Sequence, residues 1–252
     1  MFELALNTHT IRHALTDTAD AADVFKRVAA IGYQSVVLSA LPGFEDAHLR
    51  RLLDDAELPV VNLHVPSHIV RNDPEQLLRR MNTFGCSLAT YSWPADVDWL
   101  DVESIRRLIR DLRATSDILQ SCGRSLAIRH HAFELARHGD ATVLDHILEA
   151  CPALLVEPST YWLALCGCST VRFLQRHANR VPILLLQDLR GNEHNQATFE
   201  DLGEGNLNFG PIIAAAREIG CRVLAVEKDE HLGDTLSSAH RSFQRLSDWT
   251  AA

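Results

Sequence analysis

The sequence predicts a single (β/α)8 barrel over residues 1–252, and three observations lead to that fold class. Eight short runs rich in Val, Ile and Leu recur along the chain. Stretches with the apolar spacing of amphipathic helices separate these runs. No linker rich in Pro, Gly or Ser divides the chain, and a barrel of this kind needs about 250 residues.

The expected strands are apolar along their whole length rather than alternately apolar and polar. This pattern is typical of strands buried on both faces, as in a parallel sheet that helices cover. In chain order the runs are FELALNT (2–8), SVVLSAL (35–41), PVVNLHV (59–65), SLATYSW (87–93), SLAIRHH (125–131), ALLVEPS (153–159), VPILLLQD (181–188) and RVLAVEKD (222–229).

The expected helices begin and end with capping residues. Many start at Asp, Ser or Thr and several end in Gly, which are the usual residues at those two positions. A doubly wound open sheet is the alternative, but a GxGxxG motif after the first strand is absent. Helical spacing is clear in TADAADVFKRVAAIG (18–32), EDAHLRRLLDDAEL (45–58), DPEQLLRRMNTFG (73–85) and FGPIIAAAREIG (209–220).

The composition limits the classes of partner and the cellular compartment that we expect for this protein. No run of about 18 apolar residues predicts a membrane-spanning helix, and the start MFELALNTHT lacks the segments of a signal peptide. We therefore expect a soluble, cytoplasmic protein. The formal net charge is −9 with Lys and Arg scattered, which disfavours nucleic acid as a partner. A small molecule is the expected partner, and the sequence is compatible with a homo-oligomer.

Polar residues stand at the ends of the expected strands, where a barrel of this class carries its active site. Residues two apart on a strand face the same side, as Arg129 and His131 should. Polar side chains facing only apolar walls would be costly, so the pattern indicates a solvated pocket. The candidates are Asn7, His9, Ser39, His64, Trp93, Arg129, His131, Glu157, Ser159, Gln187, Asp188, Glu227 and Asp229.

Stretches along nearly the whole chain resemble the sugar phosphate isomerase/epimerase family of xylose-isomerase-like TIM barrels. The most specific are LGEGNLNF and VEKD. The full set is VFKRVAAIGYQSVVLSAL (24–41), VVNLHVP (60–66), SLAIRHHAFEL (125–135), LLVEPSTYW (154–162), VPILLLQDLR (181–190), FEDLGEGNLNF (199–209) and VEKDE (226–230).

The resemblance implies a divalent metal held by residues of strands five to eight. Carried over residue by residue, the ligand positions hold Arg129, Ser159, Leu185 and Glu227. Only Glu227 is a competent ligand, and Val37 replaces a further acid on strand two.

The positive charge of Arg129 disfavours a metal ion at this position, because a guanidinium keeps its proton in a protein. A dication about 5 Å away, at an effective dielectric of about 20, is repelled by roughly 6 kcal/mol. A repulsion of this size would weaken metal binding by about four orders of magnitude. We therefore expect no metal and no other cofactor.

Without a metal, Glu227 needs a counter-ion, and Arg129 across the barrel mouth is the natural one. One interpretation is a purely structural ion pair. The other makes Arg129 the electrophile that stabilises an enolate or carboxylate oxygen, with Glu227 as the base. His131 shares the face of Arg129 and is expected to act as acid, base or hydrogen-bond donor.

Five further residues are expected at the substrate. His64 keeps the family position on strand three. Glu157 should point inward and pair with Arg129 or His131. Gln187 replaces the lysine that relatives carry on strand seven. Trp93 and Tyr161, together with Trp162, are candidate walls for a sugar ring.

Other polar residues near the strand ends are expected to have structural roles. His130 has the opposite phase to Arg129 and should pack towards helices, and Lys228 should face a helix end. By the resemblance, Asp188, Asp229 and Glu134 hold loops.

The expected function is that of an isomerase, epimerase or lyase that removes a proton next to a carbonyl. Its substrate would be a small polyhydroxylated compound, similar to a keto-sugar or a cyclitol. Two alternatives stay open. One is a non-catalytic binding or regulatory barrel that holds a small anionic ligand, and the other is a metal enzyme with a rearranged site of His64, His131, Glu157 and Glu227. A DNA-repair endonuclease with this barrel would need a large His, Asp and Glu cluster and a basic surface, which are missing.

Overall fold

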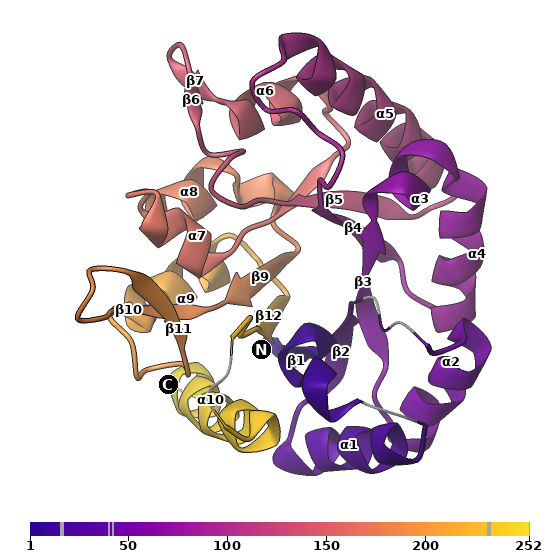
Figure 1. Cartoon of the computed structure of the whole chain (residues 1–252), viewed down its shortest axis with the longest axis vertical. Helices are drawn as coiled ribbons and strands as arrows, with labels where there is room; N and C mark the ends of the chain where they lie inside the picture. Colours follow the sequence, from indigo (N-terminus) through magenta and orange to yellow (C-terminus); the bar gives the residue numbers. More distant parts are fainter. Residues whose placement is uncertain (16–17, 40, 42, 231–232, 252) are drawn as a thin grey trace.

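The protein is a (β/α)8 barrel, as the computed structural model of residues 1–15, 18–39, 41, 43–230 and 233–251 shows (Figure 1). Eight parallel strands form one sheet in the order β8-β5-β4-β3-β2-β1-β12-β9. They are β1 (Glu3–Asn7), β2 (Ser35–Leu38), β3 (Val60–Pro66), β4 (Leu88–Trp93), β5 (Ser125–Arg129), β8 (Leu155–Glu157), β9 (Ile183–Leu186) and β12 (Val223–Val226).

The barrel closes between its two outermost strands, β8 and β9. A parallel bridge joins Ser159 to Leu185, and the backbone N–H of Leu185 donates to the carbonyl of Pro158 at 2.9 Å. Seven of the eight observed strands lie inside the apolar runs that predicted them, and β3 extends one residue beyond its run to Pro66, so the predicted fold class is confirmed.

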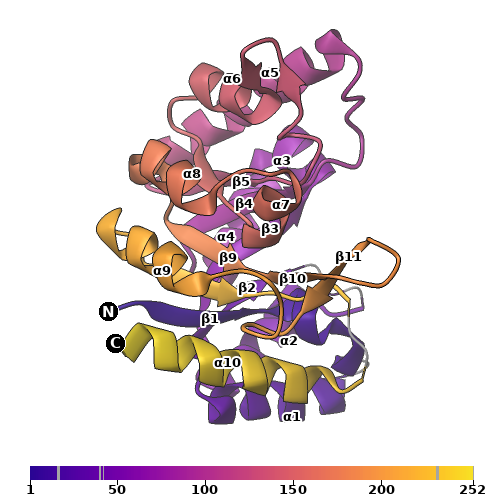
Figure 2. The same ribbon diagram turned by 90° about the vertical axis from the view of Figure 1, so that its left-hand side faces the viewer.

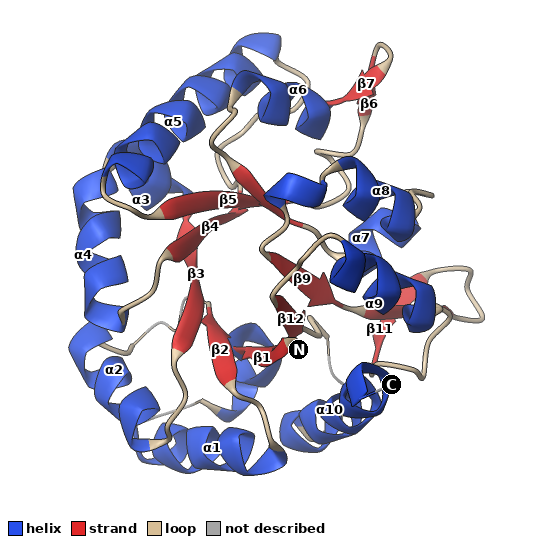
Figure 3. Cartoon of the chain, turned by 180° about the vertical axis from the view of Figure 1, so that it is seen from behind, coloured by secondary structure: helices blue, strands red, loops and turns tan. Residues whose placement is uncertain are grey.

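Helices surround the strands on the outside of the barrel (Figure 3). They are α1 (Thr18–Ile31), α2 (Asp46–Asp55), α4 (Pro74–Phe84), α9 (Phe209–Glu218), α3 (Ser67–Asn72), α5 (Val102–Ser121), α6 (Val143–Ala150), α7 (Thr160–Leu165), α8 (Thr170–Arg176) and α10 (Thr235–Ala251), with 3-10 turns η1 (Thr8–Ala14) and η2 (Ala178–Arg180). The amphipathic spacing of the sequence predicted α1, α2, α4 and α9, whose ends it placed within a few residues.

The helix α4 shows why the capping residues predicted the boundaries. The Asp73 carboxylate accepts the backbone N–H of Gln76 at 2.9 Å, and Pro74 occupies the first turn, where no intrahelical partner is lost. Gly85 ends the helix in the left-handed conformation. No helix in the part of the chain that the structure describes is long and apolar enough to cross a membrane.

Two small antiparallel hairpins extend the strand ends. The hairpin β6 (Arg137–His138) with β7 (Ala141–Thr142) follows β5, and β10 (Asp188–Gly191) with β11 (Ala197–Glu200) follows β9. In Figure 2 the β10–β11 hairpin projects away from the barrel.

Asp188 holds the glycine-rich loop that follows the β10–β11 hairpin, as the resemblance implied. Its carboxylate accepts the backbone N–H groups of Gly203, Gly205 and Leu207 at 3.0, 3.0 and 3.1 Å. A Cβ at Gly205 would collide with this carboxylate and with the carbonyl of Leu189. Glycine is therefore required where the backbone passes so close to a side chain.

Candidate functional site

A cavity of about 730 Å³ lies at the carboxyl ends of the strands. This is the end of the barrel where the sequence placed its polar residues. The cavity wall combines aromatic rings, imidazoles, one guanidinium and two carboxylates, and its members are His9, Ser39, His64, Pro66, Ser67, His68, Ser92, Trp93, Ala95, Asp96, Arg129, His131, Trp162 and Asp229.

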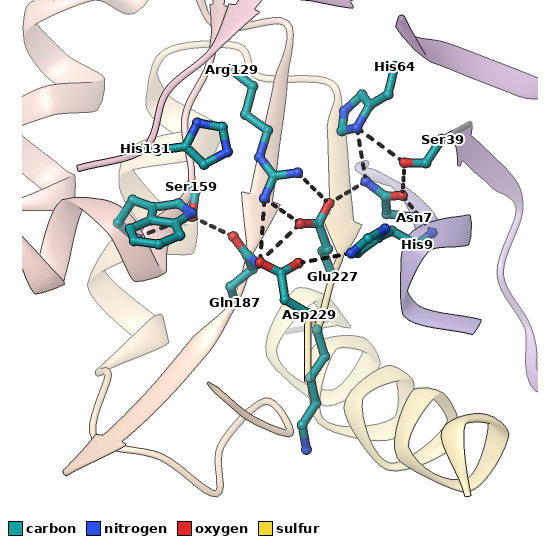
Figure 4. Close-up of polar contacts among 12 residues, drawn as sticks. Asn7, His9, Ser39, His64, Arg129, His131, Ser159, Gln187, Glu227 and Asp229 are labelled. Carbon is teal, nitrogen blue, oxygen red and sulfur yellow. Dashed lines mark hydrogen bonds and ion pairs between the residues drawn. The ribbon is translucent and has the colours of Figure 1, made fainter. Parts of the chain in front are cut away.

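The central contact of the site is an ion pair across the barrel mouth between Arg129 and Glu227 (Figure 4). Nη2 of Arg129 lies 2.5 Å from Oε1 of Glu227, and Nη1 donates to Oε2 at 3.3 Å. Arg129 ends β5 and Glu227 follows β12, so the pair joins distant strands of the sheet. This is the counter-ion arrangement that the sequence predicted.

Two amides hold the Glu227 carboxylate from the sides. Nδ2 of Asn7 donates to Oε2, and Nε2 of Gln187 donates to Oε1 at 3.2 Å. The side chain of Glu227 has 0 % exposure. Glu227 therefore lies beneath the cavity, under the guanidinium, rather than in the cavity wall.

Burial and charge act in opposite directions on this ion pair. Burial disfavours the charge on Arg129, but Glu227 and Asp229 outweigh it and raise the pKa of the guanidinium. Burial raises the pKa of Glu227 well above its ordinary value, and Arg129 opposes that increase. The result is a firmly charged guanidinium above a carboxyl group whose basicity is increased.

Asp229 is the part of this charge cluster that faces the cavity. Its side chain is 23 % exposed, and Oδ2 lies 3.9 Å from Nη2 of Arg129. The charge of Asp229 adds to the increase in the pKa of Glu227. Burial raises the pKa of Asp229, but the charge of Arg129 outweighs burial and lowers it. Two neighbouring acids therefore have pKa values shifted in opposite directions, which is typical of proton-transfer sites.

Asp229 is a residue whose role the resemblance did not indicate. The expectation was a loop-holding side chain, whereas the structure places Asp229 in the cavity wall beside the ion pair. The signal in the sequence was its spacing from Glu227, because residues two apart share a face.

His64 and Glu157 form a second buried pair on the other side of the barrel. Nε2 of His64 lies 2.8 Å from Oε2 of Glu157, and Nδ2 of Asn62 donates to Oε1 at 3.1 Å. The prediction that Glu157 pairs with Arg129 or His131 is wrong. Glu157 reaches across to β3, because the guanidinium of its neighbour Arg129 is already directed at Glu227.

Asn7 connects the two buried pairs. Its amide donates to Glu227 and lies 3.4 Å from Nδ1 of His64, and its carbonyl oxygen accepts from the Ser39 hydroxyl at 2.7 Å. A continuous hydrogen-bond network therefore runs across the floor of the cavity from Glu157 to Arg129. Figure 4 shows the part of it from His64 to Arg129. Such networks, when every member is satisfied, fix side chains in one arrangement.

His131 faces the cavity two residues after Arg129, as the strand period predicted. Its ring lies between the edges of Trp93 and Trp162, with centroids 4.9 and 5.5 Å away. Burial, and next the charge of Arg129, lower its pKa to about 3. His131 is therefore neutral at pH 7 and offers a hydrogen bond rather than a charge.

The three aromatic candidates have different surroundings. Trp93 is 55 % exposed and lines the cavity, and Trp162 lines it too. Tyr161 is instead buried beneath the β10–β11 hairpin, where it stacks on Phe199 with centroids 3.9 Å apart. Its hydroxyl donates to the carbonyl of Ala197 at 3.4 Å, so Tyr161 orients the hairpin.

Three other residues with expected structural roles lie outside the cavity wall. His130 packs against Phe173 of α8 with ring centroids 5.6 Å apart, which confirms its outward phase. Lys228 forms an ion pair with Asp201 at 2.7 Å. Glu134 accepts the backbone N–H of His131 at 2.7 Å and so holds the turn after β5.

The residues at the family's ligand positions do not fit a divalent ion. Arg129 is directed at Glu227, Leu185 is a buried apolar side chain, and the Ser159 hydroxyl donates to Gln187 at 2.5 Å. Within the described residues, no group of three or more His, Cys, Asp or Glu side chains is arranged to hold a metal. The rearranged site of His64, His131, Glu157 and Glu227 is likewise not assembled.

Comparison with known proteins identifies relatives by structure. No family model matches the sequence, and no curated protein matches it. A sugar phosphate isomerase/epimerase from Parabacteroides distasonis matches with a TM-score of 0.81 and 16 % identity over 98 % of both chains. A xylose isomerase domain protein from Alicyclobacillus acidocaldarius matches with a TM-score of 0.76 and 17 % identity, over 100 % of this chain and 99 % of that one. A D-allulose 3-epimerase from Methylomonas sp. matches with a TM-score of 0.73 and 15 % identity, over 98 % of both chains.

The chain therefore has the fold of the sugar phosphate isomerase/epimerase and xylose isomerase-like TIM barrels. This agrees with the resemblance seen in the sequence.

Proposed function

We propose that this chain is an enzyme of the isomerase, epimerase or lyase type that acts on a small polyhydroxylated carbonyl compound. The observation that carries the proposal is the buried Arg129, held 2.5 Å from Glu227 at the floor of a cavity of about 730 Å³. The fold it shares with a sugar phosphate isomerase/epimerase and a D-allulose 3-epimerase supports the substrate class.

The proposed step is removal of a proton from the carbon next to the carbonyl. The electron pair of that C–H bond moves to the carbonyl oxygen and gives an enediolate. Arg129 stabilises the negative oxygen, and neutral His131 donates a second hydrogen bond from the same face. Return of a proton to the other carbon completes an isomerisation, return to the opposite face completes an epimerisation, and loss of a neighbouring hydroxyl as water completes an elimination.

Glu227 and Asp229 form the basic side of the proposed mechanism. The sequence assigned the base to Glu227, and the structure adds Asp229 as the acid of the pair that faces the cavity. Asp229 receives the substrate proton and returns it, because its carboxylate is the one that faces the cavity. Glu227 lies beneath it and holds Arg129 in place.

In this proposal a fixed guanidinium takes the role that a divalent metal has in metal-dependent relatives. Both the metal and the guanidinium place positive charge where the enediolate oxygen develops. The site needs no added ion for that purpose, because Arg129 remains protonated at any physiological pH.

Hydrogen–deuterium exchange tests the function directly. The purified protein is incubated in D2O with D-allulose or D-fructose, with EDTA in one arm and Mn²⁺ in another. We expect NMR to show loss of the signal from the proton next to the carbonyl, at equal rates in both arms. An absolute requirement for Mn²⁺ would contradict the role of Arg129.

The same experiment separates the enzyme from the binding-protein alternative. A non-catalytic barrel would be stabilised against heat by small carboxylates without any exchange or product. The two neighbouring acids with oppositely shifted pKa values support the enzyme, because a barrel that only binds a ligand has no need of a proton-transfer group.

A further inference from the structure

We propose that the substrate of this cavity carries no phosphate group and that Asp229 selects an uncharged polyhydroxylated carbonyl compound. The inference rests on the proposed function, because it names the substrate class of the same site. Three features of the described residues carry it: an anion site that is already filled, the charge of the cavity wall, and the partly exposed carboxylate of Asp229.

The filled anion site is the glycine-rich loop after the β10–β11 hairpin. In barrels of this class the loops after the last strands frequently bind phosphate through backbone N–H groups. Here the N–H groups of Gly203, Gly205 and Leu207 all donate to the Asp188 carboxylate. A phosphate would have to displace a buried side chain around which the loop is built.

The charge of the cavity wall also disfavours a phosphate. Among the wall residues that the structure describes, Arg129 is the single Lys or Arg. Its guanidinium is shared by Glu227 at 2.5 Å and Asp229 at 3.9 Å. Asp96, the second carboxylate of the wall, is paired with Arg71 at 2.7 Å. A phosphate dianion would therefore meet the Asp229 carboxylate without a free cation to balance it.

Two imidazoles of the wall add no positive charge at neutral pH. Burial, and next the charge of Arg12, lower the pKa of His9 to about 4. Burial and Arg129 lower that of His131 to about 3. Both rings are neutral hydrogen-bonding groups, which suit hydroxyls better than a dianion.

The exposed part of the Asp229 carboxylate suits a hydroxyl better than a phosphate. The Asp229 side chain lines the cavity and is 23 % exposed. A sugar hydroxyl donates a hydrogen bond to this carboxylate, whereas a phosphate dianion has no proton to give to it.

Calorimetric titration of the full chain tests the selection. The probes are two matched pairs, D-allulose with D-allulose 6-phosphate and D-fructose with D-fructose 6-phosphate. We expect each phosphorylated ketose to bind at least about tenfold more weakly than its partner, which corresponds to about 1.4 kcal/mol.

Two matched variants identify the residue responsible. Asp229→Asn keeps the size of the side chain and removes its charge, so we expect weaker binding of the free ketoses together with tighter binding of the phosphorylated ones. A folding defect would weaken both kinds of ligand. Asp46→Asn removes a carboxylate that pairs with Arg80 outside the cavity wall, and it should leave the preference unchanged.

The outcomes keep this inference separate from the proposed function. Tighter binding of the phosphorylated ketoses to the unaltered protein, or an unchanged preference in Asp229→Asn, would overturn the inference even if exchange in D2O occurs. The expected preference without any exchange would support the inference and contradict the proposed function. Binding of none of the four probes would overturn both.

Discussion

Two layers of side chains lie next to each other inside the barrel and differ in polarity, although they come from the same strands. The lower layer is apolar and forms a small core of its own. On five of the strands the residue two positions later belongs to the upper layer and is polar. The corresponding pairs are Ala5 and Asn7, Val37 and Ser39, Ala127 and Arg129, Leu185 and Gln187, and Ala225 and Glu227.

The difference shows how one set of strands can supply both stability and chemistry. Alternation of side chains brings every second residue to the barrel axis, so both layers are placed by the same rule. The lower layer excludes water by close packing and makes no directional contact. The upper layer is equally buried but holds charges, so it depends on hydrogen bonds between strands to remain in place. The four changes below test this division, from the largest expected effect to the smallest.

Arg129→Met should have the largest effect, because it removes the charge that balances Glu227. An unpaired buried carboxylate lowers the free energy of unfolding by about 3–5 kcal/mol. Loss of the oxyanion partner should slow exchange in D2O by about 10²–10³. Chemical denaturation and NMR measure the two effects.

The matched control is Arg124→Met. Arg124 lies just before β5 at the opposite end of the barrel, where it donates to Oδ1 of Asn82 at 2.9 Å. Its loss should leave exchange unchanged. Equal effects of the two variants on exchange would show that Arg129 has no special role in the upper layer.

Leu185→Ala tests the lower layer. Leu185 is fully buried in the small inner core, so truncation should lower the free energy of unfolding by about 2–5 kcal/mol through lost burial and a new cavity. Ketose binding at the upper layer should persist at temperatures where the variant is folded. Loss of binding in the folded variant would mean that the layers are not independent.

Asn7→Ala tests whether the upper network is held as a unit. Asn7 contacts Glu227, His64 and Ser39, and leaving such partners unpaired should cost about 1–3 kcal/mol of unfolding free energy. A double-mutant cycle with Glu227→Gln should give a coupling of at least about 0.5 kcal/mol. Strict additivity would contradict a direct role of Asn7 in holding the carboxylate.

Glu134→Gln should have the smallest effect near pH 5, where Glu134 is protonated in the folded protein, and its effect on stability should appear as pH rises. Burial raises the pKa of Glu134 to about 8 in the folded protein, from 4.5. Folding therefore favours its protonated form, and stability should fall as pH rises from about 4.5 to 8. The slope is at most about 1.4 kcal/mol per pH unit.

Histidines with lowered pKa values act in the opposite direction. His130 and His131 have pKa values of about 3 in the folded protein against 6.5. Their contribution to stability therefore rises with pH up to about 6.5 and is then constant. Between pH 6.5 and 8, stability of the unaltered protein should decline, and that of Glu134→Gln should decline less steeply, because the raised pKa of Glu227 still contributes. Parallel profiles would rule out Glu134 as the source.

The sequence by itself determined the barrel and the layers. Continuous apolar runs require burial on both faces, and eight of them separated by amphipathic helices leave a closed barrel as the economical arrangement. The period of two then places Arg129 and His131 on one face at the carboxyl end of β5, and it separates His130 from them. The Arg129–Glu227 ion pair also followed from the sequence, because two buried opposite charges at the same level need each other.

Only the tertiary structure decided which long side chain reaches which partner. Glu157 pairs with His64 rather than Arg129, Glu227 lies beneath the cavity, and Asp229 faces it. Strand spacing fixes the face and height of a residue, but a carboxylate or guanidinium has several rotatable bonds and neighbours from strands far apart in the chain. The direction it takes depends on which partner satisfies its charge, and closing the barrel sets that choice.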